Sequence, residues 1–100
     1  MKNEENTGAR DNTVFIGSKP FMNYVTGVVM QFTTQGASEV MIKARGKFIA
    51  RAVDVAEVAA KRFLESTVKI VDIKVDSEEF ENKEGRQVRV STIEIALAKK

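Results

Sequence analysis

The chain contains no cysteine, histidine or tryptophan, and its single proline is Pro20. Without cysteine there is no disulfide, thiol nucleophile or thiolate ligand, and without histidine the imidazole used in most acid–base catalysis and zinc sites is missing. No P-loop, nucleophile elbow or zinc motif takes their place. These absences remove most enzyme classes, and we expect a protein that is not an enzyme and holds no cofactor and no metal.

Long apolar segments are also missing. No stretch approaches the roughly 20 apolar residues that a membrane helix requires. Residues 1–12 (MKNEENTGARDN) are polar and lack the apolar segment of a signal peptide. Because ordering them would bury little apolar surface, we expect a flexible polar tail. These features predict a cytoplasmic protein with no membrane partner.

Size and composition indicate a single domain. The 100 residues are 43% hydrophobic and 30% charged, which is enough apolar material for a core and enough charge for solubility. The length is well short of what two domains need, so we assign residues 13–100 to one domain. Since a small domain leaves much of its surface exposed, pairing with a second copy is an economical way to cover apolar area.

The net charge is only +2, but the charges are unevenly distributed. Residues 17–64 carry seven basic and three acidic side chains, whereas residues 65–85 carry three basic and seven acidic ones. Residues 86–100 are basic again, with four cations and one carboxylate. The small total therefore hides separate basic and acidic zones.

The first half of the chain predicts a strand, a helix and a second strand. Residues 13–16 form a short β-branched and aromatic run that stops at Gly17. Pro20 suits the first turn of a helix, because its missing N–H would be unpaired there. The apolar residues that follow at spacings of three and four are Phe21, Tyr24, Val25, Val28, Val29 and Phe32. Gly36 is expected to cap this helix, and residues 39–43 alternate as the second strand.

The second half predicts another helix and a long hairpin. Apolar residues from Ile49 to Phe63 recur with a 3.6-residue period. Residues 67–75 and 87–98 are rich in Val, Ile and Thr, and the polar segment between them contains the turn motif NKEG. At about 3.3 Å per residue these strands are about twice as long as the one at 39–43. The hairpin tip should therefore project beyond the sheet.

The order of these elements is β-α-β-α-β-β. It predicts an α+β fold, a two-layer α/β sandwich in which two helices cover one face of a four-stranded mixed sheet and the C-terminal hairpin protrudes. Both hairpin strands change the phase of their apolar residues, at Ile70-Val71 and across Ser91-Thr92. This change indicates either a β-bulge or twist, or a segment that helices cover on one face and a partner covers on the other.

This topology brings two basic loops together. Parallel strands with a helical crossover end at the same edge of a sheet, so the loops at residues 17–20 (GSKP) and 43–47 (KARGK) should be neighbours. Each precedes a helix N-terminus, where unpaired N–H groups and the helix dipole favour anions, and Gly17 and Gly46 allow close approach of the backbone. A single surface cation is most often merely solvated, but the grouping predicts a phosphate site. Its cations are Lys19, Lys43, Arg45 and Lys47.

The hairpin tip carries charges of both signs. Arg86 and Arg89 are placed to reach a neighbouring groove or backbone, or alternatively to pair across the strands with Glu79 or Glu81. The carboxylates of residues 76–81 have the chemistry to hold Mg²⁺. We favour the simpler role of keeping an exposed strand soluble and unpaired at its edge.

Three long segments match the signatures of a known family. They are FIGSKPFMNYV, EVMIKARGKFIARAVDVAEVAAKRF and EGRQVRVSTIEIALAKK. In order and spacing they resemble the Alba family of archaeal chromatin proteins over about residues 13–100. The resemblance implies a homodimer that coats and compacts double-stranded DNA without sequence preference, forms higher assemblies on DNA and also binds RNA. Such a protein would be associated with the chromosome, or nucleoid, in the cytoplasm.

The resemblance also implies roles for single residues. Lys19 corresponds to a lysine of the family's G-K-K-P loop that meets the DNA backbone. Lys43, Arg45 and Lys47 correspond to the basic loop after the second strand, and Arg86 to a hairpin arginine near the minor groove. All of these are expected to bind nucleic acid.

Two further positions follow from the resemblance. Ser18, also expected at the nucleic-acid contact, stands where many members have the first lysine of the loop, which is reversibly acetylated in some. This departure puts regulation by acetylation at position 18 in doubt and leaves Lys19 as the lysine of this loop open to modification. Phe63 corresponds to an aromatic residue where dimers meet on DNA, although burial in the protein's own core explains it equally well.

Two other functions fit the same residues. An RNA-binding module for RNA folding or a ribonucleoprotein would use the same basic edge, since it also accepts an A-form backbone. Exposed aromatic residues would favour single-stranded RNA, but Phe21, Tyr24 and Phe32 fall on the core-facing stripe. A purely structural assembly protein would lose nothing when the basic edge is neutralised.

Overall fold

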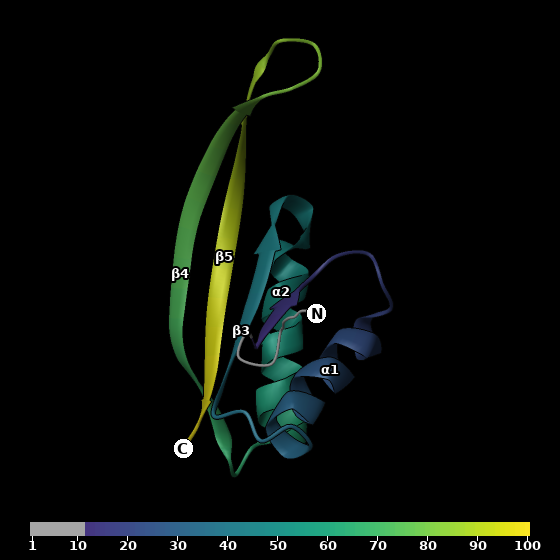
Figure 1. Cartoon of the computed structure of the whole chain (residues 1–100), viewed down its shortest axis with the longest axis vertical. Helices are drawn as coiled ribbons and strands as arrows, with labels where there is room; N and C mark the ends of the chain where they lie inside the picture. Colours follow the sequence, from purple (N-terminus) through teal and green to yellow (C-terminus); the bar gives the residue numbers. More distant parts are fainter. Residues whose placement is uncertain (1–11) are drawn as a thin grey trace, which may run out of the picture.

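Two helices pack on one face of a four-stranded sheet in the computed structural model, which describes residues 12–100 (Figure 1). The strand order is β2-β3-β5-β4. Strand β2 (Thr13–Phe15) runs parallel to β3 (Glu39–Arg45), whereas β5 (Gln87–Lys99) is antiparallel to both β3 and β4 (Val68–Glu81). The predicted α+β fold and its β-α-β-α-β-β order are confirmed.

The predicted tail, residues 1–12, lies outside the described residues except for Asn12. The carbonyl oxygen of Asn12 accepts a hydrogen bond from the N–H of Met41 in β3 (2.8 Å). The backbone contact between β2 and β3 therefore begins one residue before β2 itself.

Helix α1 (Phe21–Thr33) ends before the residue that was predicted to cap it. Its C-cap is Thr34, in a right-handed conformation, and not Gly36. Gly36 instead has φ +73° and turns the chain toward β3, so that the Ala37 N–H donates to the Gln31 carbonyl oxygen (2.9 Å). The glycine was assigned to the correct turn but to the wrong position within it.

The second helical segment has three parts. A 3₁₀ turn (Gly46–Phe48) leads into α2 (Ile49–Val58), which continues as a π-helix (Ala59–Phe63). The wider π turn redirects the last side chains, and Phe63 is 54% exposed. The alternative that Phe63 belongs to the protein's own core is therefore wrong. Every helix within residues 12–100 is too short or too polar to cross a membrane.

The core lies between the helices and one face of the sheet. On the strands it is formed by alternate residues, because successive side chains point to opposite faces. The strand residues with the least exposure are Val40, Ile42, Ile95 and Leu97, and they pack against Val25, Val28, Ala52 and Val55 of the helices. The other face of the sheet carries no helix, and we call it the open face. Its side chains include Phe15, Lys43, Arg45, Glu78, Phe80, Thr92 and Glu94.

Strands β4 and β5 continue beyond β3 as a two-stranded arm. The last pair that β3 forms with β5 is Arg45 with Thr92, whereas β4 and β5 stay paired as far as Glu81 with Gln87. Figure 1 shows the arm extending past the end of β3, on the side where β3 leads into α2. The predicted projection of the hairpin is confirmed.

A β-bulge explains the change of phase in β4. The register against β5 shifts between Ile70 and Asp72, which leaves Val71 as the extra residue. Strand β5 pairs without a shift across Ser91 and Thr92, so its own change of phase has another cause. There the strand leaves the region covered by the helices, and its apolar side chains move to the opposite face.

Two helix side chains fix the loop between β2 and α1. The hydroxyl oxygen of Tyr24 accepts hydrogen bonds from the N–H groups of Gly17 (2.9 Å) and Lys19 (3.0 Å). Arg51 of α2 donates from Nη2 to the Lys19 carbonyl oxygen (2.7 Å), and its guanidinium lies 5.9 Å from the centre of the Tyr24 ring. These bonds join the first loop to the start of α2, so the two loops are neighbours as predicted.

Tyr24 thus has a role that its helical spacing did not predict. The N–H groups of Gly17 and Lys19, which precede the helix, are already satisfied within the protein. A Cβ at position 17 would lie 3.4 Å from the Tyr24 hydroxyl oxygen, so a larger residue there would be in close contact with this hydroxyl. An anion at this loop would therefore meet the exposed side chain of Lys19 and not these two N–H groups.

Replacing Tyr24 should loosen this loop. Tyr24→Phe leaves two N–H groups without their acceptor, so the free energy of unfolding should fall by about 1–3 kcal/mol. Amide hydrogen exchange at Gly17 and Lys19, followed by NMR, should become faster. Thr33→Val is the control, because it removes an exposed hydroxyl that bonds to Val29 (2.9 Å) and should change stability by less than about 0.5 kcal/mol. Unchanged exchange at both amides in Tyr24→Phe would contradict this role.

Candidate nucleic-acid interface

The predicted basic residues gather at the edge where β2 and β3 end. Lys19 lies in the loop to α1, and Lys47 lies in the 3₁₀ turn that follows β3; both are exposed. The strand was predicted to end at Lys43 and Arg45 to lie in the loop, but β3 extends to Arg45 because Thr92 of β5 still offers it a partner. Their side chains therefore lie on the open face, two residues apart on one strand.

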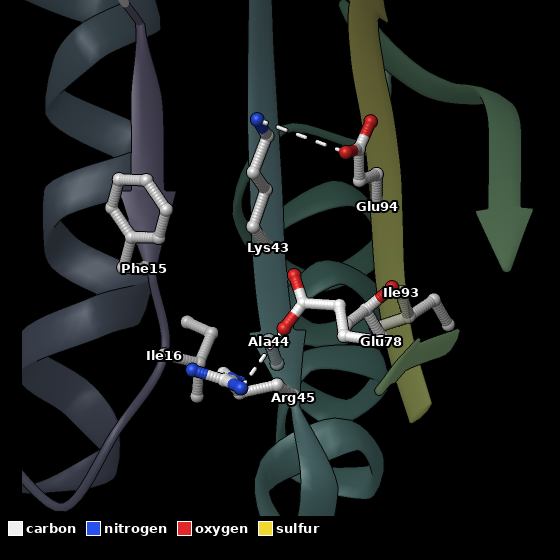
Figure 2. Close-up of a pocket in the computed structure, with 9 residues that line it drawn as sticks. Phe15, Ile16, Lys43, Ala44, Arg45, Glu78, Ile93 and Glu94 are labelled. Atoms are coloured by element: carbon white, nitrogen blue, oxygen red, sulfur yellow. Dashed lines mark ion pairs between the residues drawn. The ribbon is translucent and has the colours of Figure 1, made fainter. Parts of the chain in front are cut away.

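Carboxylates hold both of these strand cations. Lys43 Nζ lies 3.7 Å from Glu94 Oε2, and Arg45 Nη2 lies 2.9 Å from Glu78 Oε1 (Figure 2). The four side chains are between 36% and 57% exposed, so solvent screens both pairs. Exposed ion pairs contribute about 0–1 kcal/mol, which means that a phosphate can replace either carboxylate at little cost.

A hollow of about 330 Å³ lies beside these ion pairs on the open face (Figure 2). Its lining residues are Phe15, Ile16, Lys43, Ala44, Arg45, Glu78, Thr92, Ile93 and Glu94. The Phe15 ring is 68% exposed, and its centre lies 5.9 Å from Lys43 Nζ. The partly exposed Phe80 ring lies 5.9 Å from the guanidinium of Arg45. The hollow thus combines the exposed ring of Phe15 with charges of both signs, and Phe80 lies outside its lining.

Neither ring was predicted as an exposed feature. The alternation within β2 carried the necessary information, since Val14 and Ile16 face the core and Phe15 between them must face away.

The hairpin turn forms as its sequence motif predicted. Asn82 Oδ1 accepts hydrogen bonds from the N–H groups of Glu84 (2.9 Å) and Arg86 (3.0 Å), and Gly85 has φ +80°. Arg86 is thereby fixed at the end of the arm, with an exposed side chain. Asn82 is a positioning residue for Arg86, a role that was not assigned from the sequence.

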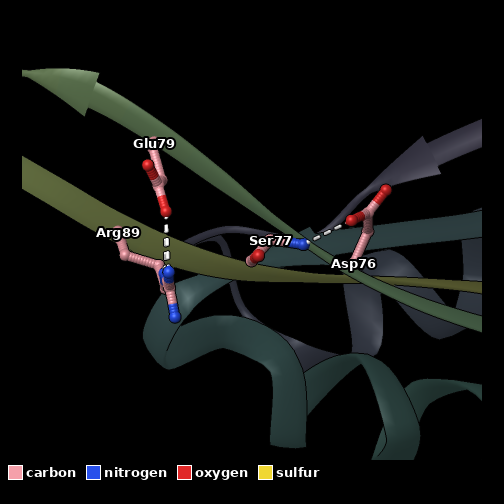
Figure 3. Close-up of polar contacts among 4 residues, drawn as sticks. All are labelled: Asp76, Ser77, Glu79 and Arg89. Atoms are coloured by element: carbon pink, nitrogen blue, oxygen red, sulfur yellow. Dashed lines mark hydrogen bonds and ion pairs between the residues drawn. The ribbon is translucent and has the colours of Figure 1, made fainter.

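Arg89 forms an ion pair with a carboxylate of the arm, whereas Arg86 does not. Arg89 pairs across the strands with Glu79, with Nη2 and Nε lying 2.7 Å and 3.2 Å from Oε2 (Figure 3). The cross-strand alternative is therefore confirmed for Arg89. The ion pairs formed within residues 12–100 do not include Arg86, which leaves its guanidinium available at the tip of the arm.

The acidic residues of the arm are divided between its two faces. Asp76 and Glu78 lie on the open face, whereas Glu79 and Glu81 lie on the opposite one. Asp76 Oδ1 accepts a hydrogen bond from the N–H of Ser77 (2.8 Å; Figure 3). No group of three or more side chains suited to a metal ion is present in the part of the chain that the structure describes.

Comparison with known proteins agrees with this arrangement. The family model described as Alba matches residues 12–77. The chain is 61% identical over 88 residues to the DNA/RNA-binding protein Alba of Nanoarchaeum equitans, which covers 87% of this chain and 97% of that protein. It is 54% identical over 90 residues to the DNA/RNA-binding protein Alba 1 of Archaeoglobus fulgidus, and the match covers 90% of this chain and 98% of that protein.

A solved structure gives the same result. Alba from Thermoplasma volcanium superimposes with a TM-score of 0.79 at 45% sequence identity, covering 87% of this chain and 99% of that one. Sequence and fold therefore point to the same relatives, and this chain belongs to the Alba family.

Proposed function

We propose that this protein is a non-enzymatic chromatin protein that binds double-stranded DNA without sequence preference and also binds RNA. Residues 13–100 act as a single nucleic-acid-binding domain. The observation that carries the proposal is the gathering of Lys19, Arg45 and Lys47 at one edge of the sheet, with the arm extending beyond the same edge. The names of its relatives, DNA/RNA-binding protein Alba, support nucleic acid as the ligand.

The proposed contacts are to the backbone of the duplex. Lys19, Lys43, Arg45 and Lys47 meet phosphates, and so does Ser18, which lies beside Lys19 in the first loop. The arm follows the duplex and brings Arg86 to the minor groove. Because phosphate contacts fix position but carry no sequence information, binding of this kind discriminates weakly between sequences.

A second copy of the chain completes this proposal. Ile73 and Val75 of β4 lie on the core side of the sheet, opposite Ile95 and Ile93, yet they are 55% and 70% exposed because α2 packs over β3 and β5. Val53 of α2 is exposed as well. An apolar strip along an edge strand suits a symmetric homodimer in which each copy covers the other.

Such a dimer would coat and compact DNA. It would carry two basic edges and two arms on one body, and the exposed Phe63 would join neighbouring dimers into a higher assembly. The protein would then reside on the chromosome in the cytoplasm. Modification of Lys19 that removes its charge would weaken the contact, since position 18 carries a serine and no second lysine.

The RNA-binding alternative uses the same edge. Its cations accept the phosphates of an A-form helix, and the exposed ring of Phe15 adds a surface on which unpaired bases stack. Duplexes of DNA and RNA with matched random sequences distinguish the two functions: comparable affinity for unrelated DNA duplexes supports the chromatin role, and strong preference for RNA supports a ribonucleoprotein role.

Binding to a duplex should depend steeply on salt. If roughly six to eight phosphates are neutralised, log K should fall with log salt with a slope of about −5 to −7. Lys19→Glu and Arg45→Glu should each weaken binding to all duplex sequences alike and reduce the magnitude of the slope by about 1. Fluorescence anisotropy over a salt series measures both quantities.

Lys61→Glu is the matched control for these variants. Lys61 is exposed and paired with Glu57 on α2, so its reversal changes the net charge equally at a different place. It should leave the slope unchanged. Binding that is insensitive to salt, or equal losses in all three variants, would contradict recognition by the basic edge.

Glu78 should limit the affinity of the free protein for DNA. Glu78→Gln releases Arg45 from its ion pair. The affinity for a duplex at low salt should then rise roughly two- to fivefold, which corresponds to the free energy that an exposed ion pair contributes. Glu57→Gln makes the same change of charge beside Lys61 and should have a smaller effect. An equal gain in both variants would indicate net charge alone as the cause.

The dimer should depend on the apolar strip of β4. Val75→Glu places a charge within the proposed interface, so this variant should elute as a monomer where the unmodified protein elutes as a dimer. Size-exclusion chromatography with light scattering reports the mass against the 11.1 kDa chain. Met22→Glu, at an exposed site on α1, should remain dimeric. A monomeric unmodified protein at micromolar concentration would refute the dimer.

A further inference from the structure

The hollow on the open face has features that backbone contacts to a duplex leave unused. Phe15 directs its ring to solvent from a strand, which costs free energy unless a ligand covers it. Its neighbours Val14 and Ile16 face the core, so the backbone of β2 fixes the direction of the ring. A fixed, exposed ring is a surface for stacking another flat group.

The carboxylate of Glu94, a hydrogen-bond acceptor, lines the hollow in line with Phe15 and Lys43. Phe15, Lys43 and Glu94 are aligned across three adjacent strands by the register of the sheet. In Figure 2 the ring and the carboxylate lie on opposite sides of Lys43. Since strands are about 4.8 Å apart, the ring and the carboxylate belong to strands separated by about 10 Å.

These three groups match the three parts of one kind of ligand. A nucleobase offers a flat face to an aromatic ring, and adenine, guanine and cytosine offer amino groups that a carboxylate accepts. The phosphate attached to the base would be attracted by Lys43. A carboxylate repels a phosphate but accepts from an amino group, so Glu94 favours a base over a bare backbone at this place.

We propose that the hollow binds an unpaired nucleobase that carries an exocyclic amino group, within a single-stranded segment of DNA or RNA. The base stacks on Phe15, Glu94 accepts from its amino group, and Lys43 contacts its phosphate. This inference rests on the proposed nucleic-acid binding and adds a site on the open face to the basic edge, which it joins at Lys43. A base within a duplex is stacked and paired, so it does not occupy the hollow.

The test compares single-stranded homopolymers with a duplex of random sequence. Fluorescence anisotropy should show tighter binding of oligo-dC than oligo-dT, and of oligo-rC than oligo-rU, because only cytosine carries the amino group. The DNA and RNA arms show which sugar the site prefers. Phe15→Ala should weaken binding of oligo-dC roughly 5- to 150-fold, the equivalent of one stacked base. The affinity of Phe15→Ala for the duplex should stay within about twofold of that of the unmodified protein, since Phe15 is outside the basic edge.

Three further variants sharpen the result. Met22→Ala removes another exposed apolar side chain, on α1, and should leave the binding of oligo-dC unchanged. Phe15→Leu keeps an apolar side chain without an aromatic face and should resemble Phe15→Ala. Glu94→Gln should reduce the preference for oligo-dC over oligo-dT, because an amide also donates to the thymine carbonyl. Photo-crosslinking of an oligonucleotide with iodinated cytosine should place the adduct on Phe15.

The outcomes separate this proposal from the proposed function. If Phe15→Ala binds oligo-dC like the unmodified protein while duplex binding persists, the hollow is not a base site and only this proposal fails. If Phe15→Leu retains full affinity, apolar contact replaces stacking and the proposal also fails. If the unmodified protein binds neither single strands nor duplexes, both proposals are wrong.

Discussion

The arrangement of this protein depends on the pairing of β3 along both of its sides. Its residues Val40 and Ile42 are fully buried beneath the helices, and its backbone is bonded to β2 on one side and β5 on the other. The parallel pairing with β2 brings both strand ends to one edge of the sheet, where the basic loops meet. The antiparallel pairing with β5 sends the arm past that same edge. One strand thus places the cations and the arm side by side.

Weak ion pairs make this basic edge compatible with a nearly neutral chain. The pairs Arg45–Glu78 and Arg89–Glu79 are exposed, so each holds a cation in place without a large stabilisation that a ligand would have to overcome. We also expect the carboxylates on the arm to keep a long two-stranded ribbon from pairing with other strands. In the proposed complex the same acidic residues would also set the charge that a nucleic acid meets.

Local hydrogen bonds hold the two ends of the proposed duplex surface. Tyr24 and Arg51 fix the loop that carries Lys19, and Asn82 fixes the turn that carries Arg86. In both places a polar side chain satisfies backbone groups that would otherwise need water. The exposed cation is thus attached to a rigid backbone, which lowers the entropy lost when it binds.

The sequence by itself determined the order of elements, the projecting hairpin and the neighbouring basic loops, because these follow from periodicity, turn residues and the rule for parallel crossovers. It left two explanations for the change of phase near Val71, and the register of the sheet decided for a bulge. Only the tertiary structure decided that Arg45 belongs to a strand, that Tyr24 occupies the loop N–H groups, and that Phe15 and Glu94 share a hollow. The strand at Arg45 and the hollow depend on partners distant in sequence. Tyr24 bonds to N–H groups only five and seven residues away, but the path of the loop decides that they reach its hydroxyl oxygen. Helical and strand periods report which face a residue occupies, whereas the register of the sheet determines what lies beside it.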